Sequence, residues 1–242
     1  MRNRILIVVS GVFLVLCIPT ILFVSGWWMP NYPSQTDYPI RGIDVSRHQG
    51  PIDWKKVSAS GIRFVYLKAT EGGYFQDPIF RENLQNARAA GLICGAYHFF
   101  TLKAPGNIQA QNFMATAPGQ LLNLPPAIDL EFWGNSSVRP SRETFQADLR
   151  IYFETVEKAS GRKPVAYYST DFANAYLKGF SIQDDWVRAI LMSPTWYRDN
   201  SWLFWQYSDR GRVPGIDGFV DLDVFNGSVD QFAALARNLA AP

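Results

Sequence analysis

The sequence predicts an α/β fold, an irregular eight-stranded (β/α)-barrel that follows an N-terminal transmembrane helix. From Arg41 onward, short β-prone runs alternate with amphipathic helical segments, a pattern typical of βα units and a parallel sheet. There are eight such runs, and eight strands suggest closure into a barrel. Only the first five are followed by helices, so the last third of the chain is expected to be helix-poor and the barrel irregular.

The predicted strands are apolar, β-branched and aromatic runs bounded by turn residues. They cover residues 43–45, 63–68, 92–99, 127–130, 165–169, 187–192, 202–206 and 219–223. Helices are expected over residues 53–60, 77–91, 107–117, 141–161 and 171–177. A Ser-Val-Asp-Gln capping box at 228–231 begins a final helix. Asp53, Asp77 and Asp171 are interpreted as residues that start helices.

The first 40 residues are predicted to lie outside the barrel. The stretch 5–25 contains no charged residue and follows two arginines, and as a helix it would span about 31 Å, enough for a bilayer core. Trp27 and Trp28 follow as an interfacial belt. The alternative is a signal peptide whose cleavage would release a secreted domain. We expect a cytoplasmic N-terminus at 1–4, a single-pass anchor at 5–28, a linker at 29–40 and an extracytoplasmic barrel domain at 41–242.

The composition of the chain narrows the classes of function that it can have. The net charge is only +2 and no basic run occurs, so nothing indicates a nucleic-acid partner. His48 and His98 lack metal-ligand spacing, so no metal or other cofactor is expected. Cys17 and Cys94 lie in different kinds of segment, and no disulfide is predicted. Aromatic residues make up 15% of the chain, more than a core of this size needs, and Trp and Tyr rings are common stacking surfaces for sugars.

The motif Asp129-Leu130-Glu131 is the main catalytic candidate. Side chains at i and i+2 of a strand point to the same face, so the two carboxylates lie side by side at the end of the 127–130 strand. Two close carboxylates repel each other, so one keeps its proton to higher pH. Glu131 reaches furthest and is expected to be the proton donor, with Asp129 as its like-charged neighbour. A proton donor beside a carboxylate suits glycoside hydrolysis; the alternative is a capping or salt-bridging pair.

Further polar residues lie at the predicted strand ends, where barrel active sites form. They are Asp44, Lys68, His98, Ser169, Gln206 and Asp221. The aromatic neighbours expected to bind substrate are Tyr97, Phe99, Tyr168 and Trp205, with core packing as the alternative. Lys68 is interpreted either as a sugar contact or as the partner of Glu71 or Asp44 in an ion pair. His98 is expected to be a hydrogen-bonded barrel residue.

With these segments in this order, the chain resembles the family-25 glycoside hydrolases, the Chalaropsis-type lysozymes. The similarity runs from Arg41 to about Asn226. Its motifs are Gly42-Ile43-Asp44-Val45-Ser46, Leu67-Lys68-Ala69-Thr70-Glu71-Gly72, Gly95-Ala96-Tyr97-His98-Phe99, Asp129-Leu130-Glu131, Trp205-Gln206-Tyr207 and Val220-Asp221-Leu222. The resemblance implies a barrel of eight strands with five helices that cleaves the β-1,4 bond between N-acetylmuramic acid and N-acetylglucosamine. It also implies Glu131 as acid/base, with essential carboxylates at Asp44, Asp129 and Asp221.

This resemblance leads us to expect a monomer whose partners are peptidoglycan glycan strands and, through the N-terminal helix, the membrane. Two mechanisms stay open: a carboxylate nucleophile, or participation of the substrate's own acetamido oxygen, toward which the resemblance leans. The alternative function is a non-catalytic peptidoglycan-binding or scaffold module on the same fold. A chitinase-like enzyme is a third, weaker interpretation, because its acidic motif is longer than Asp-x-Glu.

Overall fold

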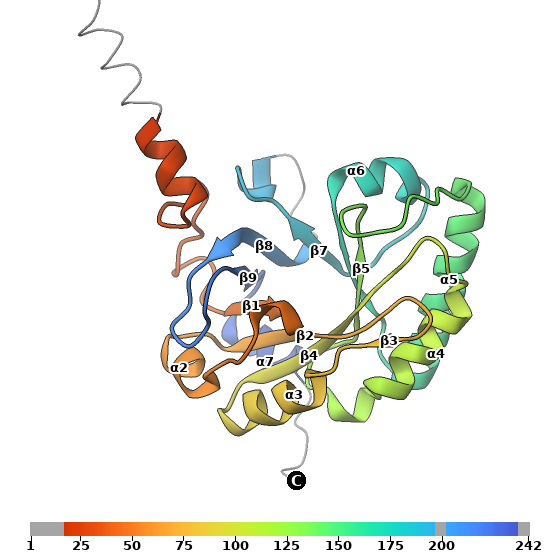
Figure 1. Cartoon of the computed structure of the whole chain (residues 1–242), viewed down its shortest axis with the longest axis horizontal. Helices are drawn as coiled ribbons and strands as arrows, with labels where there is room; N and C mark the ends of the chain where they lie inside the picture. The colour runs from red at the N-terminus through yellow and green to blue at the C-terminus, as the bar shows by residue number, and fades with distance from the viewer. Residues whose placement is uncertain (1–16, 197–201, 237–242) are drawn as a thin grey trace, which may run out of the picture.

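The computed structural model describes residues 17–196 and 202–236, and it contains a closed eight-stranded barrel with helices outside it (Figure 1). The barrel strands are β1 (Arg41–Val45), β2 (Phe64–Glu71), β4 (Ile93–Phe99), β5 (Ala127–Leu130), β6 (Val165–Tyr168), β7 (Asp185–Arg188), β8 (Trp202–Gly211) and β9 (Val220–Phe225). Their order around the sheet is β1-β9-β8-β7-β6-β5-β4-β2, and pairing of β1 with β2 closes the barrel. The predicted barrel is therefore confirmed.

One strand departs from the predicted parallel sheet. β9 runs antiparallel to both β8 and β1, whereas the other barrel pairings are parallel. The turn between β8 and β9 is short, and such a turn can only join antiparallel strands because a parallel partner needs a long crossover. A short strand, β3 (Phe75–Gln76), adds an antiparallel edge to β2.

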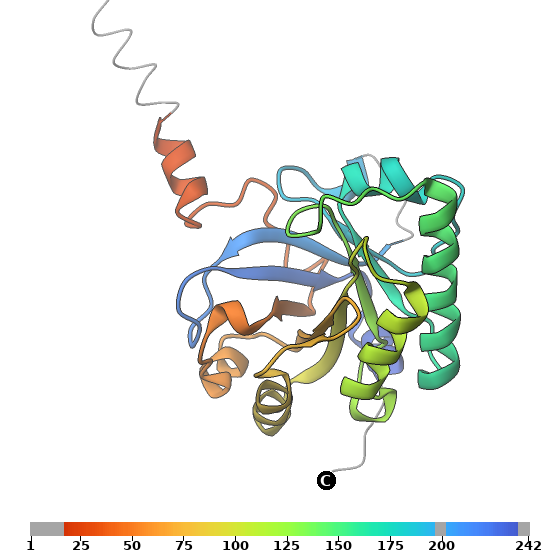
Figure 2. The ribbon, with the colours of Figure 1, turned by 45° about the vertical axis from the view of Figure 1, so that its right-hand side comes forward.

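The helices lie mainly outside the first strands of the barrel (Figure 2). They are α2 (Trp54–Ala59), α3 (Phe80–Ala89), α4 (Gly106–Thr116), α5 (Arg142–Ser160), α6 (Thr170–Phe172) and α7 (Val229–Leu235). Short 3₁₀ segments occur at Arg47–Gln49, Gly119–Leu121 and Pro194–Trp196, and a π-helical turn at Ala173–Leu177 continues α6. Phe232 of α7 packs against Phe64 and Phe225, so α7 covers the end of the barrel opposite the strand ends that carry the candidate site.

Several predicted boundaries are wrong; for example, β8 continues to Gly211, five residues beyond its predicted end. α3 begins at Phe80 and not at Asp77, because the Asp77 carboxylate accepts hydrogen bonds from the backbone N–H groups of Arg47 (2.9 Å) and Ile79 (3.1 Å) in the loop before the helix. β7 ends at Arg188, although the sequence predicts a strand over 187–192. By contrast, Asp53 caps α2 as expected, with its carboxylate accepting from the N–H of Lys56.

The helix-poor side of the barrel is covered by the segment that precedes β1. Tyr38 packs on Trp202 and Trp205, with ring centroids 5.9 and 5.5 Å apart, and Tyr32 meets Tyr207 edge-on at 5.6 Å. The predicted linker at 29–40 thus takes the place of a covering helix over β8. The predicted membrane span at 5–25 lies largely outside the described residues, and in the described part of the chain no helix has the length and apolarity needed to cross a bilayer.

Candidate active site

A cleft of about 940 Å³ opens at the carboxyl ends of the parallel barrel strands. Asp44, Asp129, Glu131 and Asp221, the four carboxylates that the sequence singles out, all line it. They come from β1, β5, the residue after β5, and β9. Three separate segments therefore deliver four carboxyl groups to one cavity, as the strand-end prediction requires.

Asp44 and Asp221 face each other across the seam where the barrel closes. They are directly paired in the antiparallel register of β1 and β9, where facing side chains lie about 5 Å apart at Cβ. Gln206 Nε2 donates to Asp44 Oδ2 at 2.9 Å, and the Tyr167 hydroxyl donates to Gln206 Oε1 at 3.1 Å. Burial raises the pKa of Asp44 to about 6 and holds the pKa of Asp221 well above its usual range.

Asp223 adds a third acid beneath this pair. Its Oδ1 accepts from the indole N–H of Trp186 at 2.9 Å, and its side chain is fully buried. Burial and the neighbouring Asp44 raise its pKa well above the usual range. Two of the three acids in this cluster can therefore stay protonated and share hydrogen bonds with the third, because three carboxylates this close and this buried cannot all be ionised.

Asp129 and Glu131 form the second acidic pair. Burial raises the pKa of Asp129 well above its usual range, and the charge of Glu131 raises it further, while Lys68 opposes both effects. One Asp129 oxygen is buried and accepts no hydrogen bond from the described residues. Burial also raises the pKa of Glu131 to about 7, although Arg188 lowers it. The expectation that Asp129 acts as the like charge on Glu131 is corrected: burial is the largest cause of the raised Glu131 pKa, and the acids that add to it are Asp44 and Asp171.

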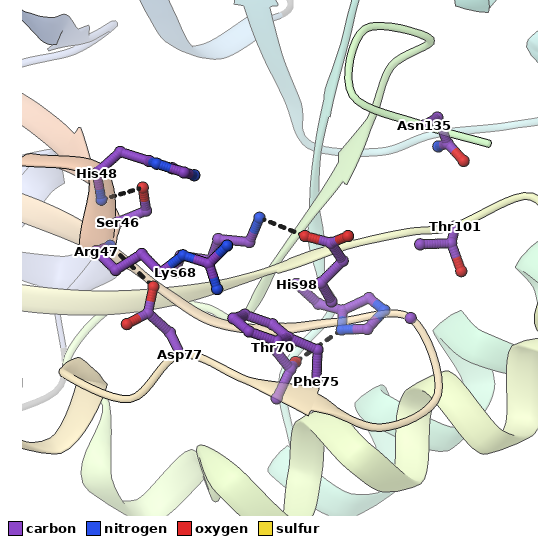
Figure 3. Close-up of polar contacts among 12 residues, drawn as sticks. Ser46, Arg47, His48, Lys68, Thr70, Phe75, Asp77, His98, Thr101 and Asn135 are labelled. Atoms are coloured by element: carbon purple, nitrogen blue, oxygen red, sulfur yellow. Dashed lines mark hydrogen bonds and ion pairs between the residues drawn. The ribbon is translucent and has the colours of Figure 1, made fainter.

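Basic residues on the cleft walls are held by acidic partners. Lys68 Nζ lies 2.8 Å from Glu71 Oε2 and 4.8 Å from the centroid of the Phe99 ring, so its ion-pair partner is Glu71 and not Asp44 (Figure 3). On the opposite wall, Arg188 lies 2.8 Å from Asp209. Each of these two ion pairs keeps a positive charge near the cleft carboxylates. Because that charge is already paired with Glu71 or Asp209, it neutralises the cleft carboxylates only in part.

His98 is a structural residue, as predicted. Its ring is fully buried, and Nδ1 lies 2.7 Å from the Thr70 hydroxyl (Figure 3). Nε2 lies 3.1 Å from Gln109 Oε1. Burial lowers the pKa of His98 to about 3, so the ring is neutral. Because an amide oxygen can only accept, Nε2 carries the proton and Nδ1 accepts from Thr70.

Asn135 fixes the loop that follows Glu131. Its side-chain N–H groups donate to the carbonyls of Phe100 (2.8 Å) and Glu131 (3.1 Å), and its oxygen accepts from the N–H of Leu102 (3.0 Å). These bonds tie the loop after β5 to the loop after β4. They also hold Trp133 at the cleft wall with 84% of its surface exposed.

The structure brings most of the predicted substrate-binding residues to the cleft, but not all of them. Tyr97, Phe99, Lys68 and Gln206 line it. Trp205 does not: its side chain is 1% exposed, its indole N–H donates to the carbonyl of Ala189, and it lies in the core on the outer face of β8. Tyr168 also packs against the outer core, away from the lining of the cleft. The groove position predicted for these two residues is corrected.

Tyr167 and Gln206, the strand neighbours of Tyr168 and Trp205, line the cleft instead, because successive strand residues point to opposite faces. Trp186, Arg188 and Asp209 also line the cleft, and like Tyr167 they are not among the residues that the sequence predicts. Side chains two residues apart in a strand point to the same face, as they do for Asp129 and Glu131. The same rule applied to Asp221 would have placed Asp223 beside it on the inner face of the barrel. Arg188 is not predicted because the expected strand runs to residue 192, whereas β7 ends at Arg188 itself. Asp171, expected only to start a helix, lies in the first turn of α6 and also lines the cleft.

Carboxyl groups that keep protons near neutral pH, set in an aromatic-walled cleft on a barrel, suit cleavage of a glycosidic bond. Fold and site thus define a glycoside hydrolase. Comparison with known proteins gives the family, since the model of glycosyl hydrolases family 25 matches residues 43–216. The chain therefore belongs to glycosyl hydrolase family 25 and is an enzyme of the glycoside hydrolase class.

Individual relatives agree. Lysozyme M1 of Streptomyces globisporus is 35% identical, over 83% of this chain and 72% of its own. A family 25 glycosyl hydrolase structure from Bacillus anthracis has a TM-score of 0.78 at 34% identity, covering 87% of this chain and 98% of its own. A bacterial lysozyme structure from Streptomyces coelicolor has a TM-score of 0.73, also at 34% identity, covering 83% and 98%.

Proposed function

We propose that this enzyme hydrolyses the β-1,4 bond between N-acetylmuramic acid and N-acetylglucosamine in peptidoglycan, with Glu131 as general acid and base. The observation that carries this assignment is the Glu131 pKa of about 7 beside an open cleft. A general acid works best when its pKa lies near the working pH. Burial supplies this pKa while the carboxyl group still reaches the cavity.

Asp129 is proposed to assist Glu131 by accepting a hydrogen bond from the substrate. Its buried, unpartnered oxygen suits the N–H of the substrate's acetamido group. Such a bond stabilises the ionised form of Asp129, so substrate binding moves the proton of the coupled pair onto Glu131, where it is needed. The acetamido oxygen then attacks the anomeric carbon while the glycosidic oxygen leaves with the proton of Glu131. Water, deprotonated by Glu131, opens the resulting oxazoline in a second displacement, so the configuration is retained overall. Direct attack by a carboxylate is the alternative, and a covalent glycosyl-enzyme intermediate would reveal it.

Asp44 and Asp221 are proposed to tune this pair and to hold sugar hydroxyls or water. The charge of Asp44 adds to the effect of burial and raises the pKa of both Asp129 and Glu131, so ionisation of Asp44 favours the protonated form of each. Gln206 fixes the position of Asp44 through its 2.9 Å hydrogen bond. The proposed contacts to the glycan are Tyr97, Phe99, Lys68 and Gln206, with the exposed ring of Trp133 as an additional stacking surface.

Residues 5–28 are proposed to anchor the enzyme in a membrane with the barrel outside the cytoplasm. The support is the uncharged run preceded by Arg2 and Arg4 and followed by Trp27 and Trp28. Cell fractionation and sequencing of the mature N-terminus test this proposal. Soluble protein that begins near Trp27 would show a cleaved signal peptide instead.

The activity is tested by digesting purified peptidoglycan with the full chain in detergent and identifying the new reducing end. N-acetylmuramic acid is expected there, and N-acetylglucosamine would refute the bond assignment. The Glu131→Gln variant should release product about 10²–10⁴-fold more slowly while still binding the glycan. If the unaltered chain binds peptidoglycan but yields no reducing ends, the non-catalytic scaffold function is correct.

A further inference from the structure

The segment between the N-terminal helix and β1 is docked on the barrel over its length. We define residues 25–38 as the strap. The described helical residues before it, 17–24, extend away from the barrel in both views (Figure 1, Figure 2). The strap itself runs back along β8 and ends on the outer core, where Tyr38 stacks on Trp202.

The first docking point joins the strap to the β8–β9 hairpin. The Arg212 Nε–H donates to the carbonyl of Ser25 at 3.1 Å, and its guanidinium lies 5.6 Å from the Trp27 ring and 5.0 Å from the Phe219 ring. Gly26 has a φ of +73°, and a Cβ there would collide with the backbone oxygen of Arg210. The chain can therefore turn at this point, and touch the hairpin, only with glycine.

Further contacts hold the rest of the strap. Asn31 Nδ2 donates to the carbonyl of Ala189 at 2.6 Å. Arg41 at the start of β1 donates to the carbonyl of Pro33 at 2.7 Å, and its guanidinium lies 4.7 Å from the Tyr32 ring. Hydrogen bonds and ring contacts thus fix both ends and the middle of the strap. Such a segment transmits orientation, which a free linker does not.

The docking point is also the rim of the cleft. Arg210 and Phe219 line the cleft, and the same two residues contact the N-terminal segment: Arg210 lies 5.7 Å from the Phe23 ring, and Phe219 shares Arg212 with Trp27. One layer of side chains therefore separates the cleft from the strap. On the other side of that layer the chain is apolar and exposed, with Ile21 at 63% and Trp27 at 74%. Apolar side chains ending in exposed Trp suit a bilayer and its interface.

We propose that the strap couples the membrane anchor rigidly to the cleft, so that the enzyme cuts glycan strands at a fixed, short distance from the membrane surface. The proposal rests on the muramidase function and on the anchor proposed above. Its partner is the bilayer interface, which the exposed apolar side chains and the rim arginines meet together. A flexible linker would instead let the barrel cut at any distance within its reach.

The test uses the full chain in phospholipid vesicles, together with glycan strands that carry a synthetic lipid at one end. Mass spectrometry measures the length of glycan that stays attached to the lipid after digestion. The unaltered chain should leave a narrow range of lengths. Eight Gly and Ser residues inserted between Ser25 and Gly26 would add about 15 Å of flexible reach and should broaden that range. The same insertion after Asn3, before the anchor, should leave it narrow.

A point substitution separates the docked turn from the insertion. Gly26→Ala should broaden the length range, because the Cβ pushes the strap off Arg210. Gly179→Ala is the matched control, since Gly179 has a similar φ of +81° with no atom near its missing Cβ. Equal length ranges for the unaltered chain and the insertion after Ser25 would overturn the proposal. The proposal would also be overturned if Gly26→Ala and Gly179→Ala left the same range of glycan lengths. It would be overturned as well if the unaltered chain did not float with the vesicles, since it would then not be bound to the membrane. Cleavage of soluble glycan by the same samples reports separately on the muramidase function.

Discussion

Replacing Glu131 with Gln should make the protein more stable while it destroys activity. The pKa of Glu131 rises from an ordinary 4.5 to about 7 in the folded state. Each pH unit corresponds to about 1.4 kcal/mol, so keeping Glu131 ionised in the fold costs about 3 kcal/mol. Because the folded state binds the proton more tightly than the unfolded state, this cost is absent below pH 4.5 and fully present above pH 7. Gln carries no charge and removes the cost.

Urea unfolding of the two proteins at pH 4 and at pH 8 measures the effect. Glu131→Gln should gain little at pH 4 and up to about 3 kcal/mol at pH 8. Over the same range kcat on peptidoglycan should be lower by about 10²–10⁴-fold, the usual contribution of a general acid. Glu154→Gln, on the exposed face of α5, is the control and should show no such gain. A stability gain of equal size at both pH values would refute the reasoning, since burial of charge could not be its cause.

Three further outcomes follow from the site. The kcat/KM of the free enzyme should fall above pH 7 as Glu131 loses its proton. Arg188→Met should move that fall to higher pH, because Arg188 lowers the pKa of Glu131. An unchanged pH profile would mean that another group controls the fall. Trp205→Ala should cost about 3–5 kcal/mol of stability in urea unfolding and leave KM unchanged. Trp133→Ala should raise KM and leave Tm unchanged. The opposite pattern would mean that Trp205 lies in the groove and Trp133 in the core. A nitrophenyl glycoside, if accepted, needs no protonation of its leaving group, so it should rescue bond cleavage in Glu131→Gln and not in Asp129→Asn; rescue of Asp129→Asn alone would exchange their roles.

The sequence predicts the acidic site well because strand geometry is simple. Asp129 and Glu131 are two residues apart at the end of a strand that two prolines precede, and Asp44 and Asp221 lie in strands of clear β character. Their convergence needed only a closed barrel, whose strand ends meet at one mouth. The fold prediction succeeds for the same reason, since alternation of strands and helices is a local pattern.

The residues that the sequence misassigns lie in strands that are apolar on both faces. In β8, Phe204 and Trp205 are equally hydrophobic, and a one-residue change of register exchanges inside and outside. Trp205 was therefore placed in the cleft although it lies behind β8. The network of His98 with Gln109 joins a strand to a helix eleven residues later, and only the tertiary structure shows it.

The seam between β1 and β9 also bears on when the enzyme becomes active. Asp44 comes from the first barrel strand and Asp221 from the last, so almost the whole domain must be synthesised before the two can meet. Contacts this distant in sequence form late in folding, because the intervening chain must be ordered first. A chain that ends before β9 therefore holds Asp44, Asp129 and Glu131 without Asp221. The order of the strands thus makes the complete set of four acids depend on synthesis and folding of almost the whole barrel.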